Sequence, residues 1–219
     1  MASLFLASRS PHRRELLAGL GYRFEVLDAA IDESRADGET PARYVERMAR
    51  EKALAGLAAV KRTGVAHGGL SPVVLGADTI VVVDGEVLGK PRDGAEVLDH
   101  LEHLSGRDHL VLSAVALATG NAGHPAVGVR LSRNRVWFRQ LSAGERRAYR
   151  ATGESADKAG SYAIQGLAAA FVTRLEGSWS AVVGLPLHET ADLLARAGLP
   201  LLSPLRGRDR GDKSVHVAH

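Results

Sequence analysis

Asp78 is a carboxylate placed where its neighbours make a charge costly. Residues 73–77 (VVLGA) and 79–83 (TIVVV) are almost entirely apolar, which is the pattern of a strand buried on both faces. A charge in such a run must be paired, hydrogen-bonded or bound to a metal ion. Buried carboxylates concentrate at functional sites, so the pattern favours a functional residue. The alternative is a carboxylate that caps a loop at a break between two shorter strands.

Lys52 is a second charge in an apolar position. It lies in a helix expected from Pro41 to about Val60. Counted at roughly 100° per residue from Tyr44, it shares one quadrant with Val45, Met48 and Ala55, whereas the other charges of the segment lie on the far side. A lysine that extends along the edge of the core, with its ammonium in water, is one interpretation. The other is a positive charge aimed at an anion in a cleft.

Residues 7–14 (ASRSPHRR) join a short apolar strand, 3–8, to a helix. Ser10 and Pro11 are a typical N-cap and first helical residue. A helix N-terminus that follows a strand is a natural anion site, and arginine adds bidentate contacts to phosphate. A plain strand–helix connection with solvated arginines has the same pattern.

Gln165 lies between Ile164 and Gly166 in a mostly apolar stretch. A buried amide must find both donors and acceptors. Uracil and thymine offer an N–H flanked by carbonyls, which one side-chain amide can satisfy. An amide that joins backbone groups across a turn is equally consistent with the pattern.

A group of acidic residues and histidines resembles a set of metal ligands. Its members are Asp99, His100, Glu102, His103 and His109. They surround the polar face of an amphipathic helix whose apolar stripe is formed by residues 97, 98, 101 and 104. We therefore expect a solvated helix face rather than a metal site.

The elements that must position these residues alternate along the chain. We expect strands over residues 3–8, 24–27, 73–83, 110–118 and 127–138, and helices from 11, 41, 94, 142 and about 189. Intermixed strands and helices predict an α/β domain folded into two lobes. We expect this domain to cover residues 1–202 and a charged, flexible tail to cover residues 203–219.

The charge of the chain is not that of a nucleic-acid-binding protein. The 219 residues carry a formal net charge of +3, and most of the excess lies in the tail, which leaves a nearly neutral body. We also expect no membrane segment and no signal peptide. The absence of cysteine excludes disulfides, thiolate nucleophiles and thiolate zinc sites, and fits a cytoplasmic protein.

Several segments together resemble the Maf family of nucleoside triphosphate pyrophosphatases. They are residues 6–17 (LASRSPHRRELL), 50–53 (REKA), 76–79 (GADT), 89–92 (GKPR), 104–106 (LSG), 157–166 (DKAGSYAIQG) and 182–187 (VVGLPL), in family order. Each piece is short, but the combination is highly specific and extends from residue 3 to about 198. The resemblance implies a mixed, twisted α/β sheet flanked by helices, with two lobes around an elongated cleft as in Maf and ITPase-like proteins. A homodimer is also implied.

The resemblance further implies hydrolysis between the α- and β-phosphates of a nucleotide, giving a monophosphate and pyrophosphate. A divalent cation, Mg²⁺ or Mn²⁺, is expected on Asp78 and Glu33, and Asp78 is expected to accept the proton of the attacking water. The residues expected to hold the triphosphate are Ser8, Arg13, Lys52 and Lys90.

The expected base-reading residues are Thr79, Gln165 and His12. The pairing of Thr79 with Gln165 resembles the branch that acts on dTTP and UTP, whereas a sister branch prefers 7-methyl-GTP. The dTTP/UTP branch usually has arginine where this chain has His12. Histidine lacks the fixed charge of arginine and its planar guanidinium, which can donate two parallel hydrogen bonds. A non-catalytic nucleotide-binding regulator of septum formation is the alternative from another class; the presence of Asp78, Lys52 and Lys90 weighs against it.

Overall fold

The computed structural model describes residues 3–62, 71–121 and 124–202. The predicted tail, 203–219, lies outside the described residues, so its boundary and its character stay predictions. The elements in chain order are β1 (Ser3–Ala7), α1 (Pro11–Gly19), β2 (Glu25–Leu27), α2 (Pro41–Arg62), β3 (Pro72–Val83), β4 (Glu86–Leu88), α3 (Gly94–Leu104), β5 (Asp108–Asn121), β6 (His124–Phe138), α4 (Ala143–Ala151), η1 (Ala159–Ser161), η2 (Leu167–Phe171), β7 (Val172–Glu176), α5 (Trp179–Val183) and α6 (Leu187–Arg196).

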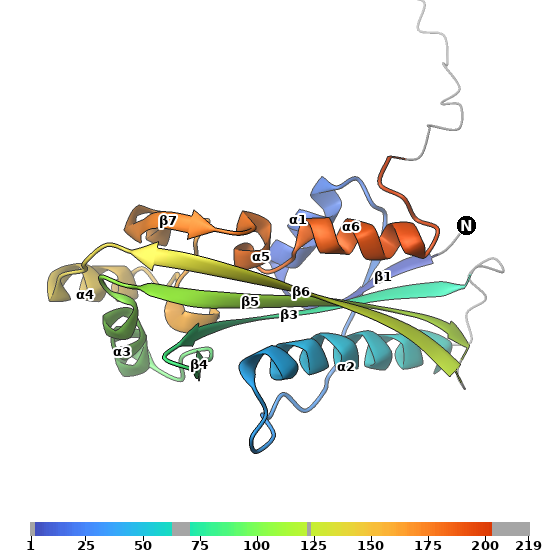
Figure 1. The fold of residues 1–219 in the computed structure, drawn as a ribbon, viewed down its shortest axis with the longest axis horizontal. Helices are drawn as coiled ribbons and strands as arrows, with labels where there is room; N and C mark the ends of the chain where they lie inside the picture. Colours follow the sequence, from blue (N-terminus) through green and yellow to red (C-terminus); the bar gives the residue numbers. More distant parts are fainter. Residues whose placement is uncertain (1–2, 63–70, 122–123, 203–219) are drawn as a thin grey trace, which may run out of the picture.

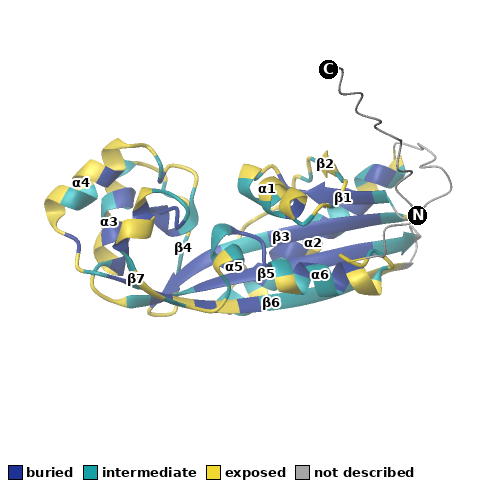
Figure 2. Ribbon diagram, turned by 90° about the horizontal axis from the view of Figure 1, so that it is seen from above, coloured by how far each residue is buried: buried dark blue, intermediate teal, exposed yellow. Residues whose placement is uncertain are grey.

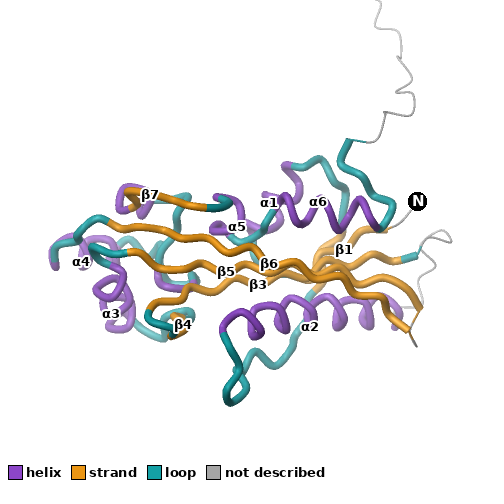
Figure 3. Tube along the Cα trace, in the orientation of Figure 1, coloured by secondary structure: helices purple, strands orange, loops and turns teal. Residues whose placement is uncertain are grey.

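The strands form one mixed sheet, in the order β2-β1-β3-β5-β6-β7 with β4 also paired to β3. The pairs that β1 makes with β2 and β3 are parallel, and the other pairs are antiparallel. The long strands β3, β5 and β6 run uninterrupted along most of the molecule (Figure 3). The structure confirms the expected mixed α/β sheet.

Two lobes share these long strands. Figure 2 shows α1, α2 and α6 around β1 and β2 at one end, and α3, α4, β4 and β7 at the other. In the first lobe α2 covers one face of the sheet, and α1 and α6 cover the other (Figure 1). The expected two-lobed architecture is confirmed.

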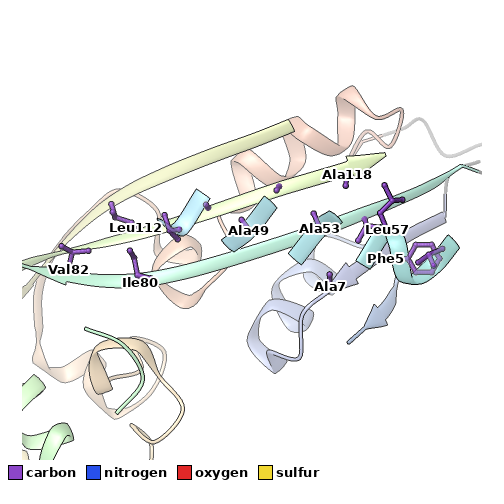
Figure 4. Packing of buried hydrophobic residues seen from close by; sticks show 14 residues of the cluster. Phe5, Ala7, Ala49, Ala53, Leu57, Ile80, Val82, Leu112 and Ala118 are labelled. Atoms are coloured by element: carbon purple, nitrogen blue, oxygen red, sulfur yellow. The ribbon is translucent and has the colours of Figure 1, made fainter. Parts of the chain in front are cut away.

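Strand β3 is buried on both faces because its side chains alternate between two cores. Val74, Ile80 and Val82 pack towards α2, in the cluster shown in Figure 4. Val73 and Leu75 pack on the opposite face, in the cluster that includes residues of α6. The continuous pairing of β3 with β5 from Val73 to Val82 excludes the alternative in which Asp78 marks a break between two strands.

The other edge of β3 is open around Asp78. β1 pairs with β3 only as far as Gly76, and β4 begins to pair with it at Val81. Residues 77–80 therefore have β5 as their only strand partner among the described residues. Because successive side chains of a strand point to opposite faces, this gap brings both faces of the sheet to one opening.

Candidate active site

A cavity of about 860 Å³ lies at the gap in the sheet, between the two lobes. Its walls come from the β1–α1 connection, the segment before α2, the middle of β3, the β4–α3 loop, and segments 157–165 and 182–184. All nine predicted site residues line it: Ser8, His12, Arg13, Glu33, Lys52, Asp78, Thr79, Lys90 and Gln165. The structure thus brings together residues that are up to 157 positions apart in the sequence.

Lys52 and two carboxylates form the charged centre of this cavity. The Nζ atom of Lys52 lies 2.8 Å from Oδ1 of Asp78 and 2.7 Å from Oε1 of Glu33. The side chains of Lys52 and Asp78 are only 11% and 14% exposed, whereas that of Glu33 is 57% exposed. The lysine is therefore not extended into bulk water but paired within the cavity.

Positive charges outweigh the effect of burial at Glu33. Burial favours the neutral acid and would raise the pKa of Glu33, but the hydrogen bond and charge of Lys52, with the charges of Lys90 and Arg13, lower it below its ordinary value. Glu33 is therefore ionised at neutral pH. Two carboxylates that meet on one ammonium can also share a divalent cation, since Mg²⁺ and Mn²⁺ prefer oxygen ligands.

Arg13 is held rigidly at the start of α1. Its Nε donates to the carbonyl oxygen of Gly184 at 2.8 Å, and its Nη1 donates to Oγ of Ser8 at 3.4 Å. The Ser10 side chain caps the helix by accepting from the backbone N–H of Arg13, as predicted. Burial lowers the pKa of Arg13, while Asp78 and Glu33 act in the opposite direction. The guanidinium remains charged because arginine stays protonated in proteins.

The second lobe contributes two lysines. Lys90 follows β4, and the carbonyl oxygen of its neighbour Gly89 accepts a hydrogen bond of 3.0 Å from the backbone N–H of Gly160. Lys158 also lines the cavity and is paired with Asp157. Our sequence analysis quoted the segment that contains Lys158 but did not select this residue. Its place in this family segment, two residues before Gly160, was the available signal.

The three predicted base-reading residues have different surroundings. Thr79 Oγ1 lies 2.8 Å from Ser113 Oγ and 3.3 Å from the Gly184 carbonyl oxygen. His12 Nδ1 is 3.5 Å from a carboxylate oxygen of Glu15. Gln165 is half-buried, and no side-chain hydrogen bond joins it to another described residue. The interpretation of Gln165 as an amide that joins backbone groups is therefore not observed in the described part of the chain.

Ser113 contacts the cavity residue Thr79 from behind, and our sequence analysis did not select it. It is fully buried on β5, opposite Thr79 in the register of the two strands, and contacts the Ala181 carbonyl oxygen. A serine within the apolar run 110–118 is the same kind of anomaly as Asp78, so the signal was present.

The predicted solvated histidine face is wrong for two of its members. His100 is buried on α3 with Nδ1 2.7 Å from Ser161 Oγ, because it follows Val97 by three residues and so shares the apolar side of the helix. His109 lies on β5, not on the helix, and its Nε2 is 2.8 Å from the hydroxyl of Tyr162. Among the described residues, no group of three or more His, Cys, Asp or Glu side chains lies close enough together to hold a metal ion.

Helices on both sides of a sheet gap, with carboxylates, lysines and an arginine around one cavity, make this an α/β protein with a charged site between two lobes, and its sequence identifies the family. The profile described as "Maf-like protein" matches residues 3–197, and the chain belongs to this Maf family. No helix of the described residues is long and apolar enough to cross a membrane.

Curated relatives cover nearly the whole chain. The chain is 50% identical over 194 residues to the dTTP/UTP pyrophosphatase of Vibrio cholerae serotype O1, covering 89% of this chain and 97% of the relative. It is 48% identical to the dTTP/UTP pyrophosphatase of Vibrio vulnificus strain YJ016, over 89% of this chain and 98% of the relative. A third protein of that name, from Aromatoleum aromaticum, is 46% identical over 209 residues, covering 91% of this chain and 98% of the relative.

Proposed function

We propose that this chain is a nucleoside triphosphate pyrophosphatase that hydrolyses dTTP and UTP to the monophosphate and pyrophosphate. The names of the relatives support this substrate choice. The observation that carries the proposal is the contact of Asp78 with Lys52 at 2.8 Å, in a cavity also lined by Arg13 and Lys90. A carboxylate beside several cations can accept a proton while the cations bind phosphate.

In the proposed reaction Asp78 accepts a proton from the attacking water. The water oxygen forms a new bond to the α-phosphorus. The bond from the α-phosphorus to the oxygen that bridges it to the β-phosphate breaks, and pyrophosphate leaves with the electrons of that bond. Arg13, Lys52 and Lys90, with Ser8, hold the triphosphate and stabilise the negative charge of the leaving group. Positioning and charge neutralisation account for most of the catalysis in such reactions.

Asp78 and Glu33 would hold a divalent cation, Mg²⁺ or Mn²⁺. The meeting of both carboxylates on one ammonium supports this assignment, because a cation already occupies the space between them. Two carboxylates are fewer than the roughly six oxygens that these ions prefer, so phosphate and water would complete the set. When bound, the cation neutralises phosphate charge and lowers the pKa of bound water.

Thr79 and Gln165 would read the base, with His12 as a third contact. Both Thr79 and Gln165 line the cavity with polar groups suited to an imide edge. His12 stands where this branch usually has arginine, so we expect the choice of base to depend less on a fixed positive charge at this position. A homodimer and a cytoplasmic location stay predictions.

Pyrophosphate release tests the proposal directly. With Mg²⁺ or Mn²⁺ present, we expect the wild-type protein to release pyrophosphate from dTTP and UTP faster than from 7-methyl-GTP. Asp78→Asn should lower kcat by about 10³-fold or more, since it removes the proton acceptor and a metal ligand. Asp99→Asn, on the exposed face of α3, is the matched control and should retain wild-type activity.

The outcomes separate the alternatives. Wild-type rates in Asp78→Asn would contradict the catalytic assignment, and a preference for 7-methyl-GTP would overturn the substrate choice. A protein that binds dTTP but releases no pyrophosphate over hours would be the non-catalytic regulator. The names of the relatives do not favour either alternative.

A further inference from the structure

The Thr79–Ser113 pair has a hydrogen-bond direction that can be worked out from its neighbours. Ser113 Oγ lies 2.5 Å from the Ala181 carbonyl oxygen. A carbonyl oxygen has no hydrogen to donate, and two oxygens at this separation repel unless a hydrogen lies between them. Ser113 therefore donates its single hydroxyl hydrogen to Ala181.

The hydrogen of Thr79 is committed as a consequence. Thr79 Oγ1 lies 2.8 Å from Ser113 Oγ, and because Ser113 has already used its hydrogen, Thr79 must be the donor. The other nearby acceptor is the Gly184 carbonyl oxygen at 3.3 Å, and it can accept only this same hydrogen of Thr79. Either way the hydrogen of Thr79 points into the protein.

Only the lone pairs of Thr79 are then available to a ligand in the cavity. Ser113 is fully buried, so water cannot compete for its hydroxyl. The Gly184 carbonyl is also fixed, since it accepts from Arg13 Nε at 2.8 Å. Thr79 is thereby prepared to accept a hydrogen bond and not to donate one.

We propose that Ser113 is a specificity-determining residue that makes Thr79 an acceptor-only group and so selects a pyrimidine carrying N3–H. This inference rests on the proposed function, in which Thr79 reads the base. Uracil and thymine present N3–H as a donor at their pairing edge, whereas the N3 of cytosine is an acceptor. An acceptor that faces an acceptor loses a hydrogen bond and leaves two polar groups unpaired, so CTP is rejected.

Kinetics with UTP and CTP test the inference. We expect Ser113→Ala to lower the ratio of kcat/KM for UTP to that for CTP by about 10-fold or more, because Thr79 then keeps only the longer contact with the Gly184 carbonyl oxygen, at 3.3 Å, and can turn its hydrogen to the N3 of cytosine. Part of this change must be an increase in CTP hydrolysis, which mere loss of structure would not produce. Thr79→Ser keeps the hydroxyl and its partner, and should retain the wild-type ratio.

A control and a second variant keep the test decisive. Ser132→Ala changes a buried serine of β6 that pairs with Ser113 across the sheet but whose hydroxyl donates to Asn134 and has no hydrogen bond with Thr79, and it should leave the ratio unchanged. Thr79→Val removes the acceptor at nearly constant volume and should lower UTP hydrolysis without increasing CTP hydrolysis. An unchanged ratio in Ser113→Ala would overturn the inference, as would an unchanged ratio in Thr79→Val if Ser113→Ala does not fold.

Failure of the proposed function gives a different result. If the wild-type protein releases no pyrophosphate from UTP or dTTP, the proposed function is wrong. If it hydrolyses UTP but discriminates against CTP independently of Ser113 and Thr79, only the inference is wrong.

Discussion

At the scale of single residues, one ammonium group holds two carboxylates in place. Lys52 contacts both Asp78 and Glu33, and its side chain is 11% exposed. In this low-dielectric position the charge interacts more strongly than it would at the surface. It offsets part of the charge of the two carboxylates, and in the proposed function it also attracts the phosphates of the nucleotide.

Removing this charge should impair catalysis more than folding. We expect Lys52→Gln to lower kcat/KM for UTP by about 10²–10³-fold, the usual loss when one group that stabilises transition-state charge is removed. The measurement is steady-state pyrophosphate release. Lys61→Gln, in the last turn of the same helix and outside the cavity, is the matched control. Equal kcat/KM values for Lys52→Gln and the wild type would exclude the assigned role.

At the scale of elements, the contact between α2 and β3 positions Lys52 against Asp78. The contact depends on Gly76, because a Cβ atom there would lie 2.4 Å from the Ala49 carbonyl oxygen and 2.5 Å from the Ala53 nitrogen. Both atoms belong to the backbone of α2 and cannot move without displacing the helix. The absence of a side chain at Gly76 therefore fixes the distance between the helix and the strand.

A methyl group at this contact should destabilise the protein. We expect Gly76→Ala to lower the free energy of unfolding by about 1–3 kcal/mol, which is the usual cost of overpacking, and to lower kcat because Lys52 moves away from Asp78. Urea denaturation gives the first quantity. Gly19→Ala is the control, since nothing lies within 4 Å of a Cβ atom there and its φ is not positive. Similar stabilities of the two variants would contradict the role of Gly76.

At the scale of the whole molecule, the lobes are joined by continuous strands. β3, β5 and β6 each run through both lobes, so closing the cavity would bend three paired strands together (Figure 1). The second lobe is further stabilised by His109, Phe138 and Tyr162, whose rings meet edge to face at centroid distances of 4.9 to 5.4 Å. We therefore expect a largely preformed cavity.

Distances between spin labels can check this rigidity. The chain contains no cysteine, so Arg14→Cys on α1 and Asp99→Cys on α3 would carry the only labels. We expect a non-hydrolysable dTTP analogue to change the mean distance between them by about 2 Å or less. A change several times larger would show that the lobes close around the nucleotide.

The stability of the whole protein should depend on pH through His109. Burial lowers the pKa of His109 from 6.5 to about 4, so the folded state keeps this ring neutral where the unfolded state binds a proton. The contribution of this group to the free energy of unfolding is therefore fully present above pH 6.5. About 3 kcal/mol of it is lost as the pH falls towards 4. Urea denaturation at pH 7 and pH 4.5 should show the loss, and His109→Gln should show less of it. An identical loss in both proteins would contradict the assignment.

The sequence predicted which residues meet at the cavity better than it predicted the contacts among them. Asp78 and Lys52 broke strong local patterns, and the structure brings both into the cavity. Ser113 was overlooked although it also breaks an apolar run, and His100 and His109 were misassigned because their partners, Ser161 and Tyr162, are distant in the sequence. Periodicity indicates which side of an element is apolar, but it does not indicate which polar group of a distant segment will contact that element.

In the fold as well, features set by neighbouring residues were predictable, whereas features set by contacts between distant segments were not. Helix starts were predictable because their caps are local: the side chain of Ser10 accepts from the backbone N–H of Arg13, and that of Ser142 accepts from the backbone N–H of Glu145. β4 was not predicted, since three residues carry too little pattern, and it exists by pairing with the end of β3. The sheet gap at residues 77–80 depends on where two separate strands stop pairing, which no local pattern encodes.

Asp78 and Thr79 are consecutive residues that face opposite sides of the sheet, the first towards Lys52 and the second towards Ser113. The groups proposed for reaction and for recognition are thus separated by one peptide bond, about 3.3 Å along the strand. A one-residue insertion or deletion earlier in β3 would exchange their sides and abolish both roles at once. A new base preference can therefore be engineered only by substitution, because the same strand register places both Asp78 and Thr79.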